Sequence, residues 1–163
     1  MPVDIAPGQP PARLVPTLLG GSGASALILI ANTAAHARGW TTLDLPVVLG
    51  LTFRRPGESG LVAAGTAWYF LTGGLLVPVL YWLALRGLRR SGAGSGALLG
   101  LVHLALASGL LALSEPRPPR RPGRGRPMGA LLRHYGWLER AANVLGHLAY
   151  GAAVGMASRG RVP

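Results

Sequence analysis

Four long segments almost free of charge constrain the fold more than any other feature of this chain. They cover residues 14–35, 61–85, 93–114 and 141–158, and we expect the last helix to begin near residue 138. A helix needs about 20 apolar residues, within a range of about 17–25, to cross a bilayer, and all four segments qualify, the last one narrowly. A soluble helical bundle would carry a polar face on each helix, and these segments have none. The sequence therefore predicts an all-α integral membrane protein, a four-transmembrane-helix bundle.

The remaining residues divide into tails, loops and a linker. Residues 1–13 are proline-rich and predicted to be a disordered tail, residues 14–158 form one membrane domain, and residues 159–163 form a second tail. Residues 115–127 are an Arg/Pro-rich linker that buries nothing. The first loop contains "LDLPVVLGLTF", which is too short to cross the bilayer, and Pro46 suits a first helical turn. We expect a short interfacial helix or a re-entrant segment there, with a loop that only caps the bundle as the alternative.

The positive charge of the chain comes from arginine alone, and the formal net charge is +11. In a soluble domain this charge would indicate nucleic acid. Arginines beside membrane spans instead set topology and contact anionic lipid head groups, so the predicted partner is the lipid bilayer and not nucleic acid. Ten of the 16 basic residues fall in the first and third loops, which places these two loops in the cytoplasm of a multi-pass cell-membrane protein. The chain has no cysteine, which excludes disulfides, thiolate metal sites and iron–sulfur clusters.

Three of the predicted spans carry a row of small residues interrupted by a polar one. In chain order the rows are Gly65, Tyr69 and Gly73, then Gly96, Gly100 and His103, then Asn143, His147, Gly151 and Gly155, with Tyr150 beside the last row. Steps of three or four place each row on one face of its helix. Small residues let helices approach closely in lipid, and polar side chains link neighbouring helices. The rows are therefore expected to face inward, with the glycines serving helix packing.

Two histidines lie at similar depth in the last two spans. His103 and His147 are each roughly 15 Å from either edge, so they are expected to meet near the midplane with Tyr69 and Asn143 close in depth. One interpretation is a neutral hydrogen-bonded cluster that only fixes helix register, in which each link contributes about 0.6 kcal/mol. The other is a functional site, because ionisable residues are rare at this depth.

The residue types limit the chemistry of such a site. Bis-histidine haem ligation by His103 and His147 needs ligand helices that stand apart, whereas the glycine rows favour contact. A metal ion needs more ligands than two histidines, an asparagine and a tyrosine supply, and no carboxylate is present for a proton relay. The sequence contains no hydrolase, P-loop, dinucleotide-binding or zincin motif. We therefore predict no catalytic residue, no metal site and no cofactor, with haem as the alternative.

The second span contains a proline and a pair of aromatic residues near its end. Pro78 is expected to distort the helix, since it removes a backbone hydrogen bond and crowds the preceding turn. Tyr81 and Trp82 are placed as residues of an interfacial aromatic belt.

Three short motifs, "LDLPVVLG" after the first span, "GLVH" in the third and "HLAYGAAVG" in the last, occur together in this chain. In this combination the chain resembles a family of small prokaryotic four-helix membrane proteins, uncharacterised in activity, with D-L-P after helix 1 and H-x-x-Y-G in helix 4. The resemblance covers residues 20–157. Members often carry a histidine in the second helix, where this chain has Tyr69, and this departure argues against a three-histidine site. The resemblance implies the fold and nothing about mechanism.

The function expected from the sequence is that of a non-enzymatic accessory or assembly protein with a structural polar seam. Its partner would be another membrane protein or a second copy of the chain. Two alternatives from other classes stay open: a membrane redox protein that binds haem or another cofactor through His103 and His147, and a small transporter or channel subunit, which would require oligomers because four narrow spans enclose little room.

Overall fold

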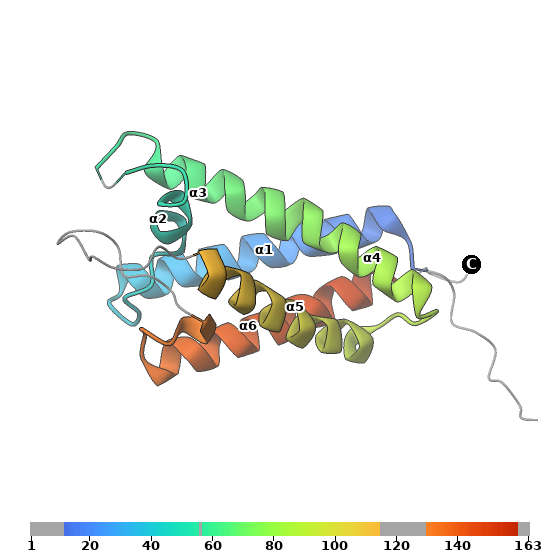
Figure 1. Ribbon diagram of the computed structural model, residues 1–163. Coiled ribbons are helices and arrows are strands. Elements are labelled where there is room, and N and C mark those ends of the chain that lie inside the picture. The colour runs from blue at the N-terminus through green and yellow to red at the C-terminus, as the bar shows by residue number, and fades with distance from the viewer. Residues whose placement is uncertain (1–11, 56, 115–129, 160–163) are drawn as a thin grey trace, which may run out of the picture.

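The computed structural model describes residues 12–55, 57–114 and 130–159, and this part of the chain is helical with no strand (Figure 1). The α-helices are α1 (Leu14–Ala37), α2 (Leu45–Gly50), α3 (Leu61–Tyr69), α4 (Val77–Gly87), α5 (Ala93–Ser114) and α6 (Trp137–Ala157). A π-helical stretch, η1 (Phe70–Leu76), joins α3 to α4, and a 3₁₀ turn, η2 (Ala130–Leu132), precedes α6. Most of the predicted N-terminal tail, the predicted linker and the last four residues lie outside the described residues.

Three helices are long and apolar enough to cross a membrane. They are α1, the continuous helix 61–87 made of α3, η1 and α4, and α5 as far as Leu110. Among the described residues α6 does not reach the same mean hydropathy, because its 21 residues include Glu139, Arg140 and His147. This is the pattern of an all-helical, multi-pass membrane protein.

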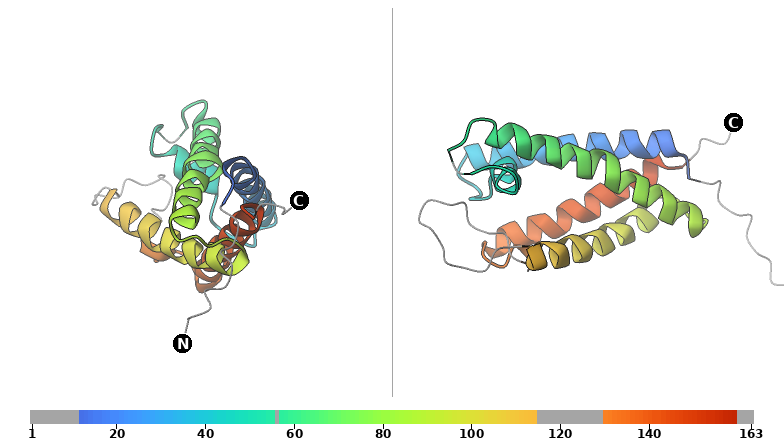
Figure 2. Two further views of the ribbon diagram at one scale, coloured as in Figure 1. Left: turned by 90° about the vertical axis from the view of Figure 1, so that its right-hand side faces the viewer. Right: turned by 45° about the horizontal axis from the view of Figure 1, so that its top comes forward.

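Each long helix runs antiparallel to the one before it (Figure 1). α5 and α6 pack together along their length, and α1 packs against both α6 and the helix 61–87. The two ends of the described chain lie side by side, and the backbone N–H of Arg13 donates to the carbonyl of Ser158 at 3.2 Å. In the right-hand view of Figure 2 the α5–α6 pair approaches the other two helices near this end and separates from them toward the end that carries α2.

The π-helical stretch is how the second long helix accommodates Pro78. Proline has no N–H, so the carbonyl four residues earlier, at Gly74, lacks its α-helical donor. The hydroxyl of Ser22 on α1 donates to that carbonyl at 3.0 Å, and the hydroxyl of Tyr150 on α6 donates to the carbonyl of Gly73. The expected distortion thus occurs as a π stretch, and the backbone groups it exposes are bonded by neighbouring helices, as helix distortions in membranes require.

The D-L-P segment forms the short helix α2. The side chain of Asp44 caps this helix by accepting the N–H three residues later at 3.2 Å, and the side chain of Asn32 on α1 accepts the N–H of Leu45 at 3.2 Å. Pro46 is buried against α3, where a Cβ atom at Gly65 would collide with its carbonyl. The segment therefore holds α1, α2 and α3 together.

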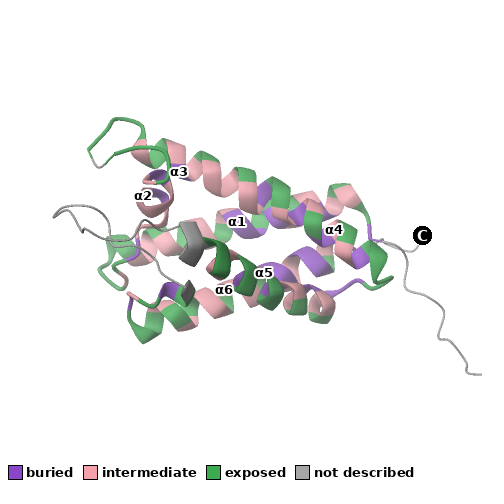
Figure 3. Cartoon of the chain, viewed as in Figure 1, coloured by how far each residue is buried: buried purple, intermediate pink, exposed green. Residues whose placement is uncertain are grey.

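One aromatic residue of the expected belt is in the interior. Tyr81 is 4% exposed and belongs to a core cluster with Ala24, Tyr150 and Val154. The belt prediction for Tyr81 was wrong because the π-helical turns before α4 change which residues face inward. Trp82 does lie near the end of its helix, with the Arg86 guanidinium 5.5 Å from its ring centroid. Figure 3 shows that the buried residues lie where the long helices face one another.

Candidate functional site

Glycine rows bring the backbones of α5 and α6 into direct contact. A Cβ atom at Gly100 would overlap the carbonyl oxygen of His147, and one at Gly151 would overlap that of Gly96. The N–H of Gly92 also donates to the carbonyl of Gly155 at 2.8 Å, across the same contact. The glycines placed in rows by sequence spacing are therefore the residues through which these two helices touch.

The two histidines lie side by side at this contact. The ring centroids of His103 and His147 are 4.9 Å apart, and the ring planes are inclined by 64°. Nδ1 of His147 is 2.8 Å from the backbone carbonyl of Asn143. Because a carbonyl only accepts, Nδ1 carries the proton, and in the neutral ring Nε2 is left as an acceptor. Nδ1 of His103 is buried and has no hydrogen-bond partner among the described residues.

Two tyrosines complete what we call the ring cluster, which consists of Tyr81, His103, His147 and Tyr150. The centroid of Tyr150 lies 5.8 Å from that of Tyr81 and 6.0 Å from that of His103, and all these pairs meet edge to face. Sequence reasoning missed Tyr81, although the spacing of Pro78, Tyr81 and Leu85, all buried, follows one helix face.

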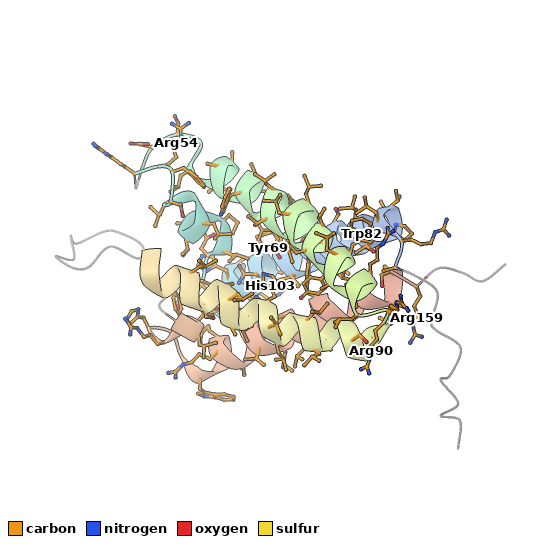
Figure 4. The ribbon with its side chains drawn as sticks, turned by 45° about the vertical axis from the view of Figure 1, so that its right-hand side comes forward. Arg54, Tyr69, Trp82, Arg90, His103 and Arg159 are labelled. Atoms are coloured by element: carbon orange, nitrogen blue, oxygen red, sulfur yellow. The ribbon has the colours of Figure 1, made fainter. Side chains whose placement is uncertain are left out.

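A cavity of about 510 Å³ adjoins the ring cluster. At its inner end the lining includes Tyr69, His103, His147 and Tyr150, which belong to three different long helices. Figure 4 shows Tyr69 and His103 near each other in the middle of the bundle. At its outer end the lining includes residues of loop 1 and the start of α6, namely Trp40, Thr41 and Glu139. The cavity therefore reaches from the edge of the bundle to its centre.

Ser25 is the most deeply buried polar group in the lining. It is 1% exposed, and its Oγ lies near the Tyr69 hydroxyl but outside hydrogen-bond geometry, so within the described part of the chain it has no partner. A buried hydroxyl without a partner costs free energy. Ser25 and His103 thus offer two unsatisfied polar groups to whatever occupies the cavity. Ser25 lies outside the rows predicted from glycine spacing, because its contact with η1 depends on the π stretch.

The mouth of the cavity is bridged by Glu139. One carboxylate oxygen accepts from the hydroxyl of Thr41 at 3.4 Å and from the N–H of Thr42 at 3.5 Å, both weak bonds by their length. Loop 1 is thereby linked to the first turn of α6.

The remaining predicted site residues lie in different surroundings. Asn143 lines the cavity and provides the carbonyl that orients His147. Gly73 lies against α1, where an added Cβ would be 2.8 Å from Ser25 Oγ. Gly65 contacts α2 and not a neighbouring long helix, because loop 1 folds back onto the start of α3.

The geometry limits which groups the site can hold. Within the described residues there is no set of three or more His, Cys, Asp or Glu side chains close enough to hold a metal ion. Haem between His103 and His147 would require their helices to stand apart, and the contacts of Gly100 and Gly151 leave no room there for a macrocycle. What the arrangement supplies is neutral hydrogen-bonding groups and ring edges at the end of a cavity.

No protein-family model, curated protein or solved structure matches the chain. The resemblance of the D-L-P and H-x-x-Y-G motifs to a membrane-protein family therefore stays a prediction.

Proposed function

We propose that the chain is a four-span protein of the cell membrane with a non-enzymatic accessory function, carried out by binding a small neutral ligand in the cavity beside the ring cluster. The observation that carries the proposal is the cavity of about 510 Å³ that ends at two unsatisfied buried groups, Ser25 Oγ and His103 Nδ1. The first and third loops lie on the cytoplasmic side in this proposal, following the distribution of arginines.

The length and surroundings of α6 support a fourth span. Its 21 residues extend about 31 Å at a rise of about 1.5 Å per residue, which matches a hydrocarbon core of about 30 Å. Its two central polar residues, Asn143 and His147, line the cavity inside the bundle. The bond between Arg13 and Ser158 keeps the end of α6 level with the start of α1. A helix with these contacts crosses the bilayer with its polar side turned inward.

The lining defines the class of ligand. Its inner end has hydroxyl groups, imidazoles and ring edges, and the one charged residue of the lining, Glu139, is at the mouth. Aromatic edges favour a flat ring, and the unsatisfied groups favour a ligand with oxygen atoms that exchange hydrogen bonds with Ser25 and His103. The volume lies within the range of about 300–1,000 Å³ typical of small-molecule sites. We propose a neutral, planar molecule with carbonyl or hydroxyl oxygens.

The same geometry favours binding over the other functions. No carboxylate of the described residues lies beside the histidines to form a relay, since Asp44, Glu58 and Glu139 all lie toward the end of the bundle that carries α2. A path from the cavity to the other end of the bundle would have to cross the core cluster of Ala24, Tyr81, Tyr150 and Val154, all of which are buried. A transporter or channel function would thus need a rearrangement or a pore shared between copies.

The test uses duroquinone, a small neutral quinone, as the probe and tryptophan fluorescence as the readout, because Trp40 lines the cavity mouth. Wild-type protein in lipid nanodiscs is expected to show saturable quenching. Gly146→Leu is expected to abolish saturation, since Gly146 lines the cavity and has open space where the side chain would go. Gly109→Leu is the matched control: this glycine also has open space beside it, but it lies outside the lining. Linear, non-saturating quenching in the wild type, or equal saturation in both variants, would refute the proposal.

A further inference from the structure

The end of the bundle opposite the cavity mouth has a different electrostatic character. Its described arginines are Arg13, Arg86, Arg89, Arg90 and Arg159. The acidic residues of the described chain, Asp44, Glu58 and Glu139, all belong to the other end, in loop 1 and the start of α6. No carboxylate of the described residues therefore lies at this arginine end.

A hollow of about 460 Å³ lies at this end, where the turn between α4 and α5 meets the first turns of α5. The lining consists of Leu88, Arg90, Gly94, Ser95, Leu98 and Leu99. Arg90 and Ser95 supply hydrogen-bond donors, and an added Cβ at Gly94 would meet nothing, so the polar part is open.

A second arginine reaches the same turn from the end of α6. The guanidinium of Arg159 lies directly over Gly92, where a Cβ atom would collide with it. Gly92 has a φ of 112°, a backbone conformation that glycine adopts without strain, so the position favours glycine for two reasons. Arg90 and Arg159 appear at the same end of the molecule in Figure 4. Neither side chain has a hydrogen bond or ion pair with a described residue.

The apolar part of the hollow continues toward the membrane. Leu98 is 63% exposed and lies one turn deeper along α5 than Gly94, and Leu99 follows it. In the spanning helix α5 Leu98 faces outward, toward the hydrocarbon region, Leu99 packs partly against the core cluster inside the bundle, and Arg90 stands at the membrane edge. Charged side chains above an apolar groove at one membrane edge match a phospholipid, which has a charged head group above apolar acyl chains.

We propose that this hollow binds an anionic phospholipid, with its phosphate and acidic head group at Arg90 and Arg159 and the start of an acyl chain along Leu98. A lipid with net negative charge is favoured over a zwitterionic one because the arginine end has no carboxylate of its own among the described residues. The site requires α5 to lie in the membrane but does not depend on the ligand proposed for the cavity.

The test is native mass spectrometry of the purified full chain in micelles that contain phosphatidylglycerol and phosphatidylcholine in equal amounts. Wild-type protein is expected to retain one phosphatidylglycerol in preference to phosphatidylcholine. Arg90→Gln and Arg159→Gln are each expected to lower this preference about fivefold, as for removal of one arginine near an anionic membrane surface. The control Arg54→Gln/Arg55→Gln removes two exposed arginines of loop 1, at the other end, and is expected to leave it unchanged. Helicity by circular dichroism identifies any variant that fails to fold. If one of the two single variants does not fold, the lipid preference of the other one tests the proposal.

Three results would overturn the proposal. The first is equal retention of the two lipids by the wild type. The second is an unchanged preference in the folded Arg90→Gln and Arg159→Gln variants. The third is displacement of phosphatidylglycerol by inorganic phosphate at millimolar concentration, which would show a simple anion site in place of a lipid site.

Discussion

The two halves of the bundle differ in how closely their helices approach one another. In the half near the α4–α5 turn, glycines at Gly96 and Gly155 let two helix backbones touch. In the half near α2, α1 and α6 face each other mainly through residues larger than glycine, and a cavity remains between them. The difference shows that the closest residue at each helix crossing sets whether this bundle is closed or hollow, because lipid-embedded helices approach as far as their side chains allow.

The ring cluster lies where the closed half meets the hollow half. His147 contacts Gly100 through its backbone and lines the cavity with its side chain. Tyr150 bonds to the carbonyl of Gly73 and so ties α6 to the π stretch. The polar seam is therefore structural on one side and available to a ligand on the other.

The largest effect is expected from filling the closed half. Gly151→Leu places a side chain where even a Cβ overlaps the carbonyl of Gly96, and we expect a loss of about 3 kcal/mol or more in the free energy of unfolding. Unfolding by SDS in mixed micelles, followed by circular dichroism, measures this. The same change at Gly146, on the same helix but with open space beside it, is expected to leave the protein folded. Equal stability of the two variants would refute the contrast between the halves.

A smaller loss is expected from the bond that joins α6 to the π stretch. Tyr150→Phe removes the donor to the Gly73 carbonyl and should cost about 0.6 to 1.7 kcal/mol in the same unfolding assay. Tyr81→Phe is the matched control, because the Tyr81 hydroxyl is buried without a partner and its removal should cost nothing or stabilise. A larger loss for Tyr81→Phe than for Tyr150→Phe would contradict this assignment.

The bond from Ser22 to the Gly74 carbonyl exists because Pro78 withholds an N–H. Ser22→Ala should therefore cost about 0.6 kcal/mol in the wild type and less in a Pro78→Ala background, where the restored N–H can bond to that carbonyl. A double-mutant cycle measures this coupling. Strictly additive effects would mean that the proline and the serine act independently.

The smallest effect is expected at the cavity mouth. Glu139→Gln keeps an oxygen acceptor, and the two bonds it affects are long, at 3.4 and 3.5 Å. We expect a change of less than about 0.5 kcal/mol in the free energy of unfolding. A loss comparable with that of Tyr150→Phe would contradict the weakness assigned to the two bonds of Glu139.

The contact between α5 and α6 in the closed half could be predicted from the sequence, because residues spaced by four lie on one helix face by helix geometry alone. That geometry placed Gly100 and His103 on one face of α5, and Asn143 and His147 on one face of α6. The hollow half was not accessible in this way. Ser25 and Tyr81 enter the site only because seven π-helical residues before Pro78 change the facing of α4 and free carbonyls for other helices, and no periodic pattern reports such a change.

The number of membrane-spanning helices also depends on more than the sequence pattern. α1, the helix 61–87 and α5 are apolar enough to cross a membrane by composition. α6 carries the polar groups of the site, which lower its mean hydropathy, so its place in the bilayer depends on which way those groups face. By composition alone α6 is therefore less apolar than the other long helices, but it packs against both α5 and α1.

The middle of this bundle is reached through a cavity that opens at one end. The natural chain has no cysteine, so a single introduced thiol reports its own surroundings. In lipid nanodiscs Gly146→Cys, nine residues inside α6, should react with a water-soluble maleimide and be protected by duroquinone. Gly109→Cys, five residues from the end of α5 and outside the cavity lining, should react more slowly although it is nearer to the edge. An unreactive thiol at residue 146 would contradict the account.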